Sequence, residues 1–271
     1  MSVFGEKNYW ALILGASSGM GLATAHKLAK EGMNVALVYR ERRTREEEVA
    51  QEIETMEDHG VEILACNTDA LNDLKRQEVL SQLQDKVGLG RVRVLLHSIA
   101  KGNLKLMTPA PSDEAISYPA QLLETTDFAM TSDSMAFSLV PWLNDLVSMG
   151  IQDTNMRILT LTSAGDDRIW RGYAAVATAK AALEALTKYI AVEYAHLGLT
   201  ANVIEAGVTI TPSMQLIPGS EVIIEKAASQ HPKGRLTQPE DVANVVSLLC
   251  RDEANWINGS RLVVDGGERL L

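Results

Sequence analysis

The stretch LGASSGMGLA, residues 14–23, decides the fold, because its three glycines join an apolar run to a segment with helical spacing. The missing Cβ atoms of Gly15, Gly19 and Gly21 let the backbone turn tightly and approach a diphosphate. The helix that follows would add N–H donors and the positive end of its dipole. The stretch therefore predicts a nucleotide-binding turn, and a tight turn without a ligand is the alternative interpretation.

Apolar, strand-like runs alternate with helix-like segments along the rest of the chain. The expected strands span residues 9–16, 34–40, 61–69, 92–100, 157–163, 200–207 and 260–267. The expected helices follow the glycine turn and span residues 44–60, 74–88, 127–149, 173–197 and 238–252. Continuously apolar strands separated by helices are typical of a parallel sheet with helices on both faces. The sequence therefore predicts an α/β, doubly wound Rossmann fold of about seven strands.

Two segments, 101–126 and 208–233, break this alternation, and the first of them carries three prolines. Both follow the C-terminal end of an expected strand, which is where open α/β sheets carry their ligand crevice. No Gly/Ser-rich linker and no internal repeat divides the chain. We therefore predict a single domain over residues 1–271, with these two segments as substrate-side loops.

The composition argues against several classes of function. The chain has 271 residues, 46% of them hydrophobic, and a formal net charge of -10, which disfavours binding to nucleic acid or to an anionic membrane surface. No apolar run approaches the roughly 18 residues of a membrane span, so we expect a soluble, cytoplasmic protein. Cys66 and Cys250 lack any CxxC or Cys/His spacing, so we expect reduced core cysteines and neither a disulfide nor a metal site.

The end of the second expected strand bears on the choice of cofactor. The sequence there reads VYRERRTR, residues 38–45. An acidic residue at this place binds a ribose 2′-hydroxyl and favours NAD(H), whereas an arginine accommodates the 2′-phosphate of NADP(H). Arg40 favours NADPH, while Glu41 keeps NADH as an alternative, and a solvated run of charges is the interpretation without a ligand.

A tyrosine and a lysine in GYAAVATAK, residues 172–180, form a candidate catalytic pair. A phenol of pKa about 10 needs a nearby ammonium to act as an acid at neutral pH. Tyr173 and Lys180 are seven residues apart on one helix face, about 10 Å along the axis, so the lysine would act through something between them, such as a nicotinamide ribose. A packed tyrosine and a solvated surface lysine are the alternative.

Two further strand ends carry polar residues. Asp69 ends the third expected strand and would either accept a hydrogen bond from an adenine amino group or cap the next turn. The sequence HSIA, residues 97–100, ends the fourth strand, and its small residues would let a cofactor ribose lie close to the backbone. We interpret His97 itself as a packed strand residue.

Together these features resemble the short-chain dehydrogenase/reductase family over nearly the full chain. The matching features are the glycine turn, Asp69, HSIA (97–100), LTS (161–163), Tyr173 with Lys180, AG (206–207) and VVDGG (263–267). The usual member has its tyrosine four residues before the lysine, where this chain has Val176. The Tyr-x6-Lys spacing, HSIA and the run KAALEALTKYIAVE (180–193) are similar to the divergent branch of NADPH-dependent enoyl-acyl-carrier-protein reductases.

This resemblance implies reduction of the C2=C3 double bond of an enoyl thioester, carried on acyl carrier protein, by hydride from NADPH or NADH in fatty-acid synthesis. It implies Tyr173, Lys180 and Ser163 as catalytic residues. The expected cofactor-binding residues are Gly15, Ser17, Ser18, Gly19, Met20, Gly21, Arg40, Asp69, Ala70, Ser98, Ile99, Ala100, Lys180, Gly207, Thr209 and Thr211. No asparagine occurs at 131–134, where the wider family has one, so the usual proton relay is not expected in its usual form.

Two other functions stay open at this point. One is a short-chain reductase acting on a ketoacyl or ketone substrate, and Val176 argues against it. The other is a protein that senses NADP without catalysis, and the presence of both Tyr173 and Lys180 argues against that. The resemblance further implies a homotetramer. An acidic carrier protein would dock on a local basic patch, for which the candidates are Lys101, Lys105, Arg168 and Arg171.

Overall fold

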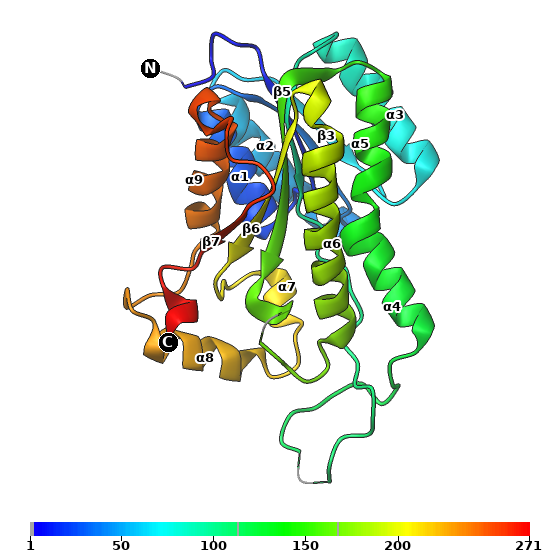
Figure 1. Ribbon diagram of the computed structural model, residues 1–271, viewed down its shortest axis with the longest axis vertical. Helices are drawn as coiled ribbons and strands as arrows, with labels where there is room; N and C mark the ends of the chain where they lie inside the picture. The colour runs from blue at the N-terminus through cyan, green and yellow to red at the C-terminus, as the bar shows by residue number, and fades with distance from the viewer. Residues whose placement is uncertain (1–2, 113, 167) are drawn as a thin grey trace.

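The computed structural model describes residues 3–112, 114–166 and 168–271. Seven strands in these residues form one parallel sheet in the order β3-β2-β1-β4-β5-β6-β7 (Figure 1). The strands are β1 (Trp10–Leu14), β2 (Asn34–Tyr39), β3 (Ile63–Asn67), β4 (Val92–His97), β5 (Gln152–Ser163), β6 (Thr200–Ala206) and β7 (Arg261–Val264). The order reverses between β1 and β4, which confirms the doubly wound α/β fold and places its ligand crevice there.

Alternate side chains of each central strand enter two separate cores. Ala11 and Ile13 point to the same face of the sheet, because alternate residues of a strand share a face. They pack in one core with residues of α1 (Gly19–Lys30), α2 (Glu46–Glu57) and α9 (Pro239–Cys250). Leu12 and Leu14 pack in the other core with residues of α3 (Asp73–Val87), α5 (Leu139–Ser148) and α6 (Ala174–Glu193). Both faces of the sheet are therefore covered by helices, which explains the unbroken apolar strands.

The helix expected over 127–149 is present, with one irregular turn in its middle. Here α4 (Thr125–Ser132) and α5 are joined by a π-helical turn, Asp133–Phe137. Such single π turns insert a residue into a helix and are frequent at functional sites. Within the turn, Met135 packs against Val176 and Ala179 near the start of α6. The π turn therefore supplies a side chain to the contact between this helix and α6.

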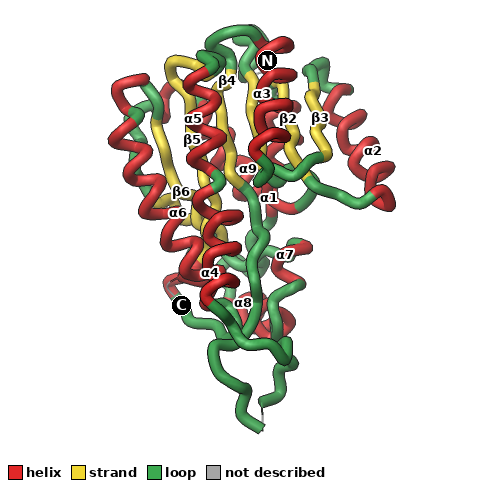
Figure 2. Tube along the Cα trace, turned by 90° about the vertical axis from the view of Figure 1, so that its right-hand side faces the viewer, coloured by secondary structure: helices red, strands yellow, loops and turns green. Residues whose placement is uncertain are grey.

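The two expected irregular segments differ from each other. The segment 208–233 is largely helical and contains α7 (Pro212–Gln215) and α8 (Ser220–Gln230), so the prediction of irregular structure there was wrong. In α8 only Ser220 is buried, which gave no core-facing pattern to recognise. The described residues of 98–124 contain no helix or strand, and this chain segment projects beyond the C-terminal edge of the sheet (Figures 1 and 2).

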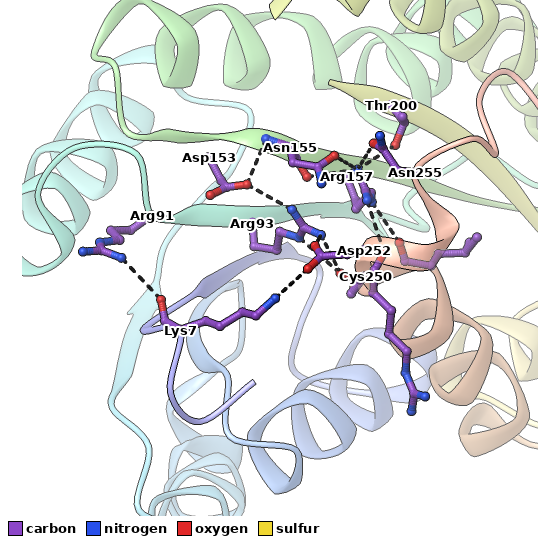
Figure 3. Close-up of polar contacts among 12 residues, drawn as sticks. Lys7, Arg91, Arg93, Asp153, Asn155, Arg157, Thr200, Cys250, Asp252 and Asn255 are labelled. Carbon is purple, nitrogen blue, oxygen red and sulfur yellow. Dashed lines mark hydrogen bonds and ion pairs between the residues drawn. The ribbon is translucent and has the colours of Figure 1, made fainter. Parts of the chain in front are cut away.

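Two arginines are almost fully buried near the opposite, N-terminal edge of the sheet (Figure 3). Arg93 on β4 donates to the carbonyl of Cys250 and to the carboxylates of Asp153 and Asp252. Arg157 on β5 donates to the carbonyls of Leu249 and Arg251, and burial together with the charge of Arg93 lowers its pKa to about 10. The two guanidinium groups thus satisfy carbonyls at the C-terminal end of α9.

Two remaining expectations concern the cysteines and the membrane. Both thiols are free, with Cys250 buried and Cys66 only half-buried, so the core position expected for Cys66 holds only in part. None of the helices in the described part of the chain combines the length and apolar character needed to cross a bilayer.

Candidate active site

A cavity of about 1540 Å³ opens at the C-terminal ends of the strands, next to the reversal between β1 and β4. All three expected catalytic residues line it, as does every expected cofactor-binding residue except Gly21. The motifs that lie more than 150 residues apart in the sequence therefore meet at one place, as the strand order requires.

The glycine turn is a cradle in which side chains do not fit. Gly15 and Gly19 have φ of +87° and +54°, and a Cβ added at Gly15 would lie 2.5 Å from the Ser98 carbonyl oxygen. A Cβ at Gly21 would lie 2.1 Å from the Gly15 carbonyl oxygen, so Gly21 closes the turn rather than lining the cavity. The turn precedes the N-terminus of α1, so its geometry fits a dinucleotide pyrophosphate.

The end of β2 places charges of both signs beside this turn. The Glu41 carboxylate accepts hydrogen bonds from the Ser17 hydroxyl at 2.9 Å and from Arg45 at 2.8 Å. Arg40 is exposed and donates to Asp69 at 2.9 Å. Asp69 also accepts from the backbone N–H of Leu71, so the structure shows the turn-capping alternative, and its contact with adenine stays a prediction. Sequence reasoning missed the fixed position of Glu41.

Tyr173 and Lys180 both reach the cavity from the start of α6. Tyr173 is the residue just before the helix, which begins at Ala174 rather than at 173. Its ring packs on Gly165, where an added Cβ would lie 2.5 Å from the Tyr173 Cε1 atom. The Lys180 ammonium donates to the Leu161 carbonyl at 3.3 Å, and Ser163 stands two residues further along the same strand. The three residues thus share one side of the cavity.

The position four residues before the lysine is buried in the wall of the cavity. Val176 is 5% exposed and packs in a small core with Met135 and Ala179. A Cβ added at Gly102 would lie 2.7 Å from its Cγ2 atom and 2.8 Å from the Thr131 Cγ2 atom. The chain segment that follows β4 therefore packs on Val176, and Val176 lines the cavity beside this contact.

Hydroxyl groups of α4 and the π turn hold that segment in place. The Thr131 hydroxyl accepts from the backbone N–H of Asn103 at 3.1 Å. The Ser134 hydroxyl lies 2.9 Å from the carbonyl oxygen of Lys101 and shares its one proton with the nearer Met130 carbonyl at 2.6 Å. The region where the wider family carries an asparagine therefore fixes the segment over α6, a role that its sequence did not reveal.

His97 is a fully packed strand residue, as expected. It is 1% exposed, and its Nε2 atom lies 2.9 Å from the Ser138 hydroxyl. Burial, and then the nearby charge of Lys180, lower the pKa of its imidazole to about 4. The ring is therefore neutral at physiological pH.

The segment after β6 folds over the glycine turn. A Cβ at Gly19 would lie 3.2 Å from the Thr211 Cγ2 atom, so these two elements are in contact. Thr209 is buried and donates to the Gly207 carbonyl. Glu268 accepts from the backbone N–H of Val208 at 2.8 Å and lines the cavity, although sequence reasoning missed it. The signal was its place directly after the VVDGG motif.

The side of the cavity away from the glycine turn is apolar. Trp170 lies there, and its indole N–H donates to the Pro218 carbonyl, which ties the segment before α6 to the segment before α8. Besides Met135 and Val176, the apolar lining residues of this part of the cavity are Leu104, Ile169, Trp170, Met214, Leu216, Ile217, Val222 and Ile223. Most of them come from 208–233, as expected for a substrate-side segment, whereas 101–126 contributes only its first residues.

The four candidate basic residues are not equivalent. Lys105 is paired with Asp127 at 2.9 Å, and Arg171 is paired with Glu114. Lys101 and Arg168 are exposed and line the cavity, and Arg168 is also paired with the Glu268 carboxylate at 3.8 Å. Of the four residues, Lys101 and Arg168 therefore reach the cavity, and Arg168 does so beside an acidic residue.

A dinucleotide cradle facing a tyrosine, a lysine and a serine is the site of an NAD(P)-dependent oxidoreductase. The chain belongs to the short-chain dehydrogenase/reductase family, since its residues 15–268 match the family model described as enoyl-(acyl carrier protein) reductase.

Individual relatives are distant but cover the chain. A 3-oxoacyl-[acyl-carrier-protein] reductase of Staphylococcus epidermidis is 27% identical over 261 residues, 96% of this chain and 98% of its own. A 1-cyclohexenylcarbonyl-CoA reductase of Streptomyces collinus is 27% identical over 272 residues, 98% of this chain and 89% of its own. The fold matches the crystal structure of an enoyl-[acyl-carrier-protein] reductase (NADH) from Aquifex aeolicus VF5, with a TM-score of 0.79 and 23% identity over 97% of both chains.

Proposed function

We propose that this protein reduces the C2=C3 double bond of an enoyl thioester. The observation that carries the proposal is the site at the start of α6, where Tyr173 reaches the cavity and the position four residues before Lys180 is Val176, which lines the cavity but cannot transfer a proton. Hydride addition at C3 places negative charge on the thioester oxygen, which lies further along the substrate than the carbonyl of a ketone acceptor. A proton donor about one helical turn earlier is suited to that oxygen.

The residues of the chain divide the work between binding and proton transfer. Bound NAD(P)H supplies the hydride. The glycine turn and the N-terminus of α1 bind the pyrophosphate, and Lys180 holds the nicotinamide ribose and favours the ionised form of the phenol. The Tyr173 hydroxyl donates to the thioester oxygen and stabilises the enolate charge, and the Ser163 hydroxyl is a second donor on the same side.

NADPH is the proposed cofactor. Arg40, Arg42 and Arg45 all line the cavity at the end of β2, where a 2′-phosphate would lie. Against them stand Glu41, which is tied to Ser17 and Arg45, and Asp69, which is tied to Arg40. NADH is the alternative, because a carboxylate fixed beside the turn is also suited to a ribose 2′-hydroxyl.

An acyl thioester fits the remaining part of the cavity. The apolar side chains that line it, such as Leu104, Leu216 and Ile223, offer hydrocarbon surface to an acyl chain. Lys101 and Arg168 give the cavity a basic edge, on which an acidic acyl carrier protein would dock. We propose fatty-acid synthesis as the setting and a homotetramer as the assembly, following the family resemblance.

Reduction of a ketoacyl thioester is the second candidate. The relative from Staphylococcus epidermidis carries that activity in its name, and this chain keeps Ser163 in the position of the wider family's serine. Val176 argues against it, since the usual acid of ketone reduction would stand there and a valine side chain cannot transfer a proton. The name of the Streptomyces collinus relative supports a thioester substrate.

The test is direct turnover with both substrate classes. The purified protein is assayed with NADPH and NADH against crotonyl and longer 2-enoyl thioesters, and against acetoacetyl thioesters, by nucleotide absorbance. We expect oxidation of the nucleotide with enoyl substrates and loss of turnover in Tyr173→Phe with cofactor affinity retained. Turnover of acetoacetyl substrates alone would show that the enoyl proposal is wrong.

A further inference from the structure

Two buried side-chain atoms near Lys180 have no hydrogen-bond partner among the described residues. They are Nδ1 of His97 and Oγ1 of Thr162. His97 is 1% exposed and Thr162 is 3% exposed, so neither atom is satisfied by bulk solvent. A buried polar group without a partner is costly, and such groups are normally satisfied by an ordered water where protein partners are lacking.

The tautomer of His97 follows from its neighbours. The Ser138 hydroxyl has one proton and donates it to the Ser134 carbonyl at 2.9 Å. We assign the Ser138 proton to this carbonyl, so that the hydroxyl accepts from His97 and the imidazole proton is on Nε2. In this tautomer the buried Nδ1 atom carries a lone pair without a donor.

Sheet register places the two atoms and Lys180 together. His97 pairs with Thr160 across β4 and β5, and Thr162 follows two residues later on the same face. That face is the one covered by α6, because Thr160 hydrogen-bonds to Thr187 of that helix. The Lys180 ammonium donates to the carbonyl of Leu161, which lies between Thr160 and Thr162.

We propose that His97 and Thr162 hold one buried water molecule against the Lys180 ammonium, and that they are positioning residues for this lysine. The water donates to His97 Nδ1, exchanges a hydrogen bond with the Thr162 hydroxyl and accepts from Lys180, so all of its partners are satisfied. Three polar partners are the usual number for a buried water. Together with the Leu161 carbonyl, this water fixes the ammonium at the cavity wall.

This inference rests on the cofactor role proposed for Lys180, and it is independent of the choice between enoyl and ketoacyl substrates. Its test therefore needs no substrate. NADPH is titrated into the full-length protein and followed by nucleotide fluorescence, for the wild type and for His97→Leu, His97→Asn and Thr162→Val. Thr160→Val is the matched control, because Thr160 is also buried on this face but is already satisfied by Thr187.

Loss of one buried hydrogen-bond partner is expected to weaken NADPH binding about fivefold in His97→Leu and in Thr162→Val. His97→Asn, which restores an acceptor, is expected to recover most of the affinity. Thr160→Val is expected to lose stability to urea without losing affinity. If His97→Leu does not fold, Thr162→Val and His97→Asn carry the same comparison.

A second readout reports on the lysine itself. The rate at which an amine-directed reagent modifies Lys180 in the cofactor-free protein is measured by mass spectrometry. Release of the ammonium is expected to raise this rate in His97→Leu and Thr162→Val, and to leave it unchanged in Thr160→Val. Equal affinities and equal modification rates in all the variants would overturn the proposal, and so would a high-resolution crystal structure with no water between these atoms.

Discussion

The contact between Gly165 and Tyr173 yields a prediction whose size follows from the geometry. A Cβ at Gly165 would lie 2.5 Å from the Tyr173 Cε1 atom, 0.9 Å inside the 3.4 Å at which ordinary van der Waals contact begins. In Gly165→Ala the ring must therefore move by about 1 Å, and a misplacement of that size costs about 100-fold in rate, equivalent to about 2.7 kcal/mol of barrier. We expect kcat to fall by that factor while NADPH affinity is retained.

The assay compares kcat for an enoyl thioester, the dissociation constant of NADPH and urea unfolding in the same preparation. Overpacking is expected to cost about 1–3 kcal/mol of stability. Gly60→Ala is the control, because Gly60 has φ of +76° and no atom within 4 Å of an added Cβ. It should cost about 1–2 kcal/mol through left-handed backbone strain and leave kcat unchanged. If folded Gly165→Ala keeps kcat within twofold of the wild type, the ring position does not govern proton transfer.

Three other variants test separate parts of the structure. Glu41→Gln removes a fixed carboxylate near the expected 2′-phosphate, so kcat/KM for NADPH relative to NADH should rise about fivefold, and an unchanged ratio would place Glu41 away from that phosphate. Val176→Tyr should lower Tm through overpacking of about 1–3 kcal/mol against Met135 and Gly102 and should not create ketoacyl turnover, whose appearance would show that a phenol at 176 can reach a substrate. A hydrogen bond from Lys7 and the charge of Arg93 lower the pKa of Asp252 in the folded protein. These contacts therefore stabilise the fold at pH values above the unfolded pKa of 3.8, and this stabilisation is lost as the pH falls below that value. Acid titrations of stability should show less of this loss in Lys7→Met, and identical acid profiles would contradict the assignment.

The strands and the glycine turn could be predicted because their signals are local. Seven apolar runs of strand length correspond to the seven strands, and the three glycines correspond to positions where a side chain clashes or φ is positive. The meeting of the motifs at one cavity could also be predicted, because the C-terminal ends of parallel strands lie at one edge of the sheet. The family resemblance then supplied the roles of residues such as Ser163 and Thr211, which spacing alone does not give.

The features that were missed depend on contacts between distant segments or on an unusual environment. The face of α8 that lines the cavity mixes the apolar Val222 and Ile223 with the polar Lys226 and Gln230, so it lacks the apolar stripe of a helix packed on the core. Glu41 stands in a run of arginines that resembles a solvated surface, and only the fold brings it to Ser17. Glu268 acts on a backbone N–H 60 residues away, which no local pattern encodes.

The structural basis for the tyrosine's position extends beyond α6. Gly102 covers one side of Val176, and the Thr131 hydroxyl fixes the backbone next to that glycine by accepting from the N–H of Asn103. The π turn supplies Met135 on another side. Val176 itself lines the cavity, so a larger side chain at this position would have to pack against both of these segments before it reached a substrate. Placing a phenol there therefore requires more than one exchange on α6, and the single substitution at Val176 is expected to give no ketoacyl turnover for that reason.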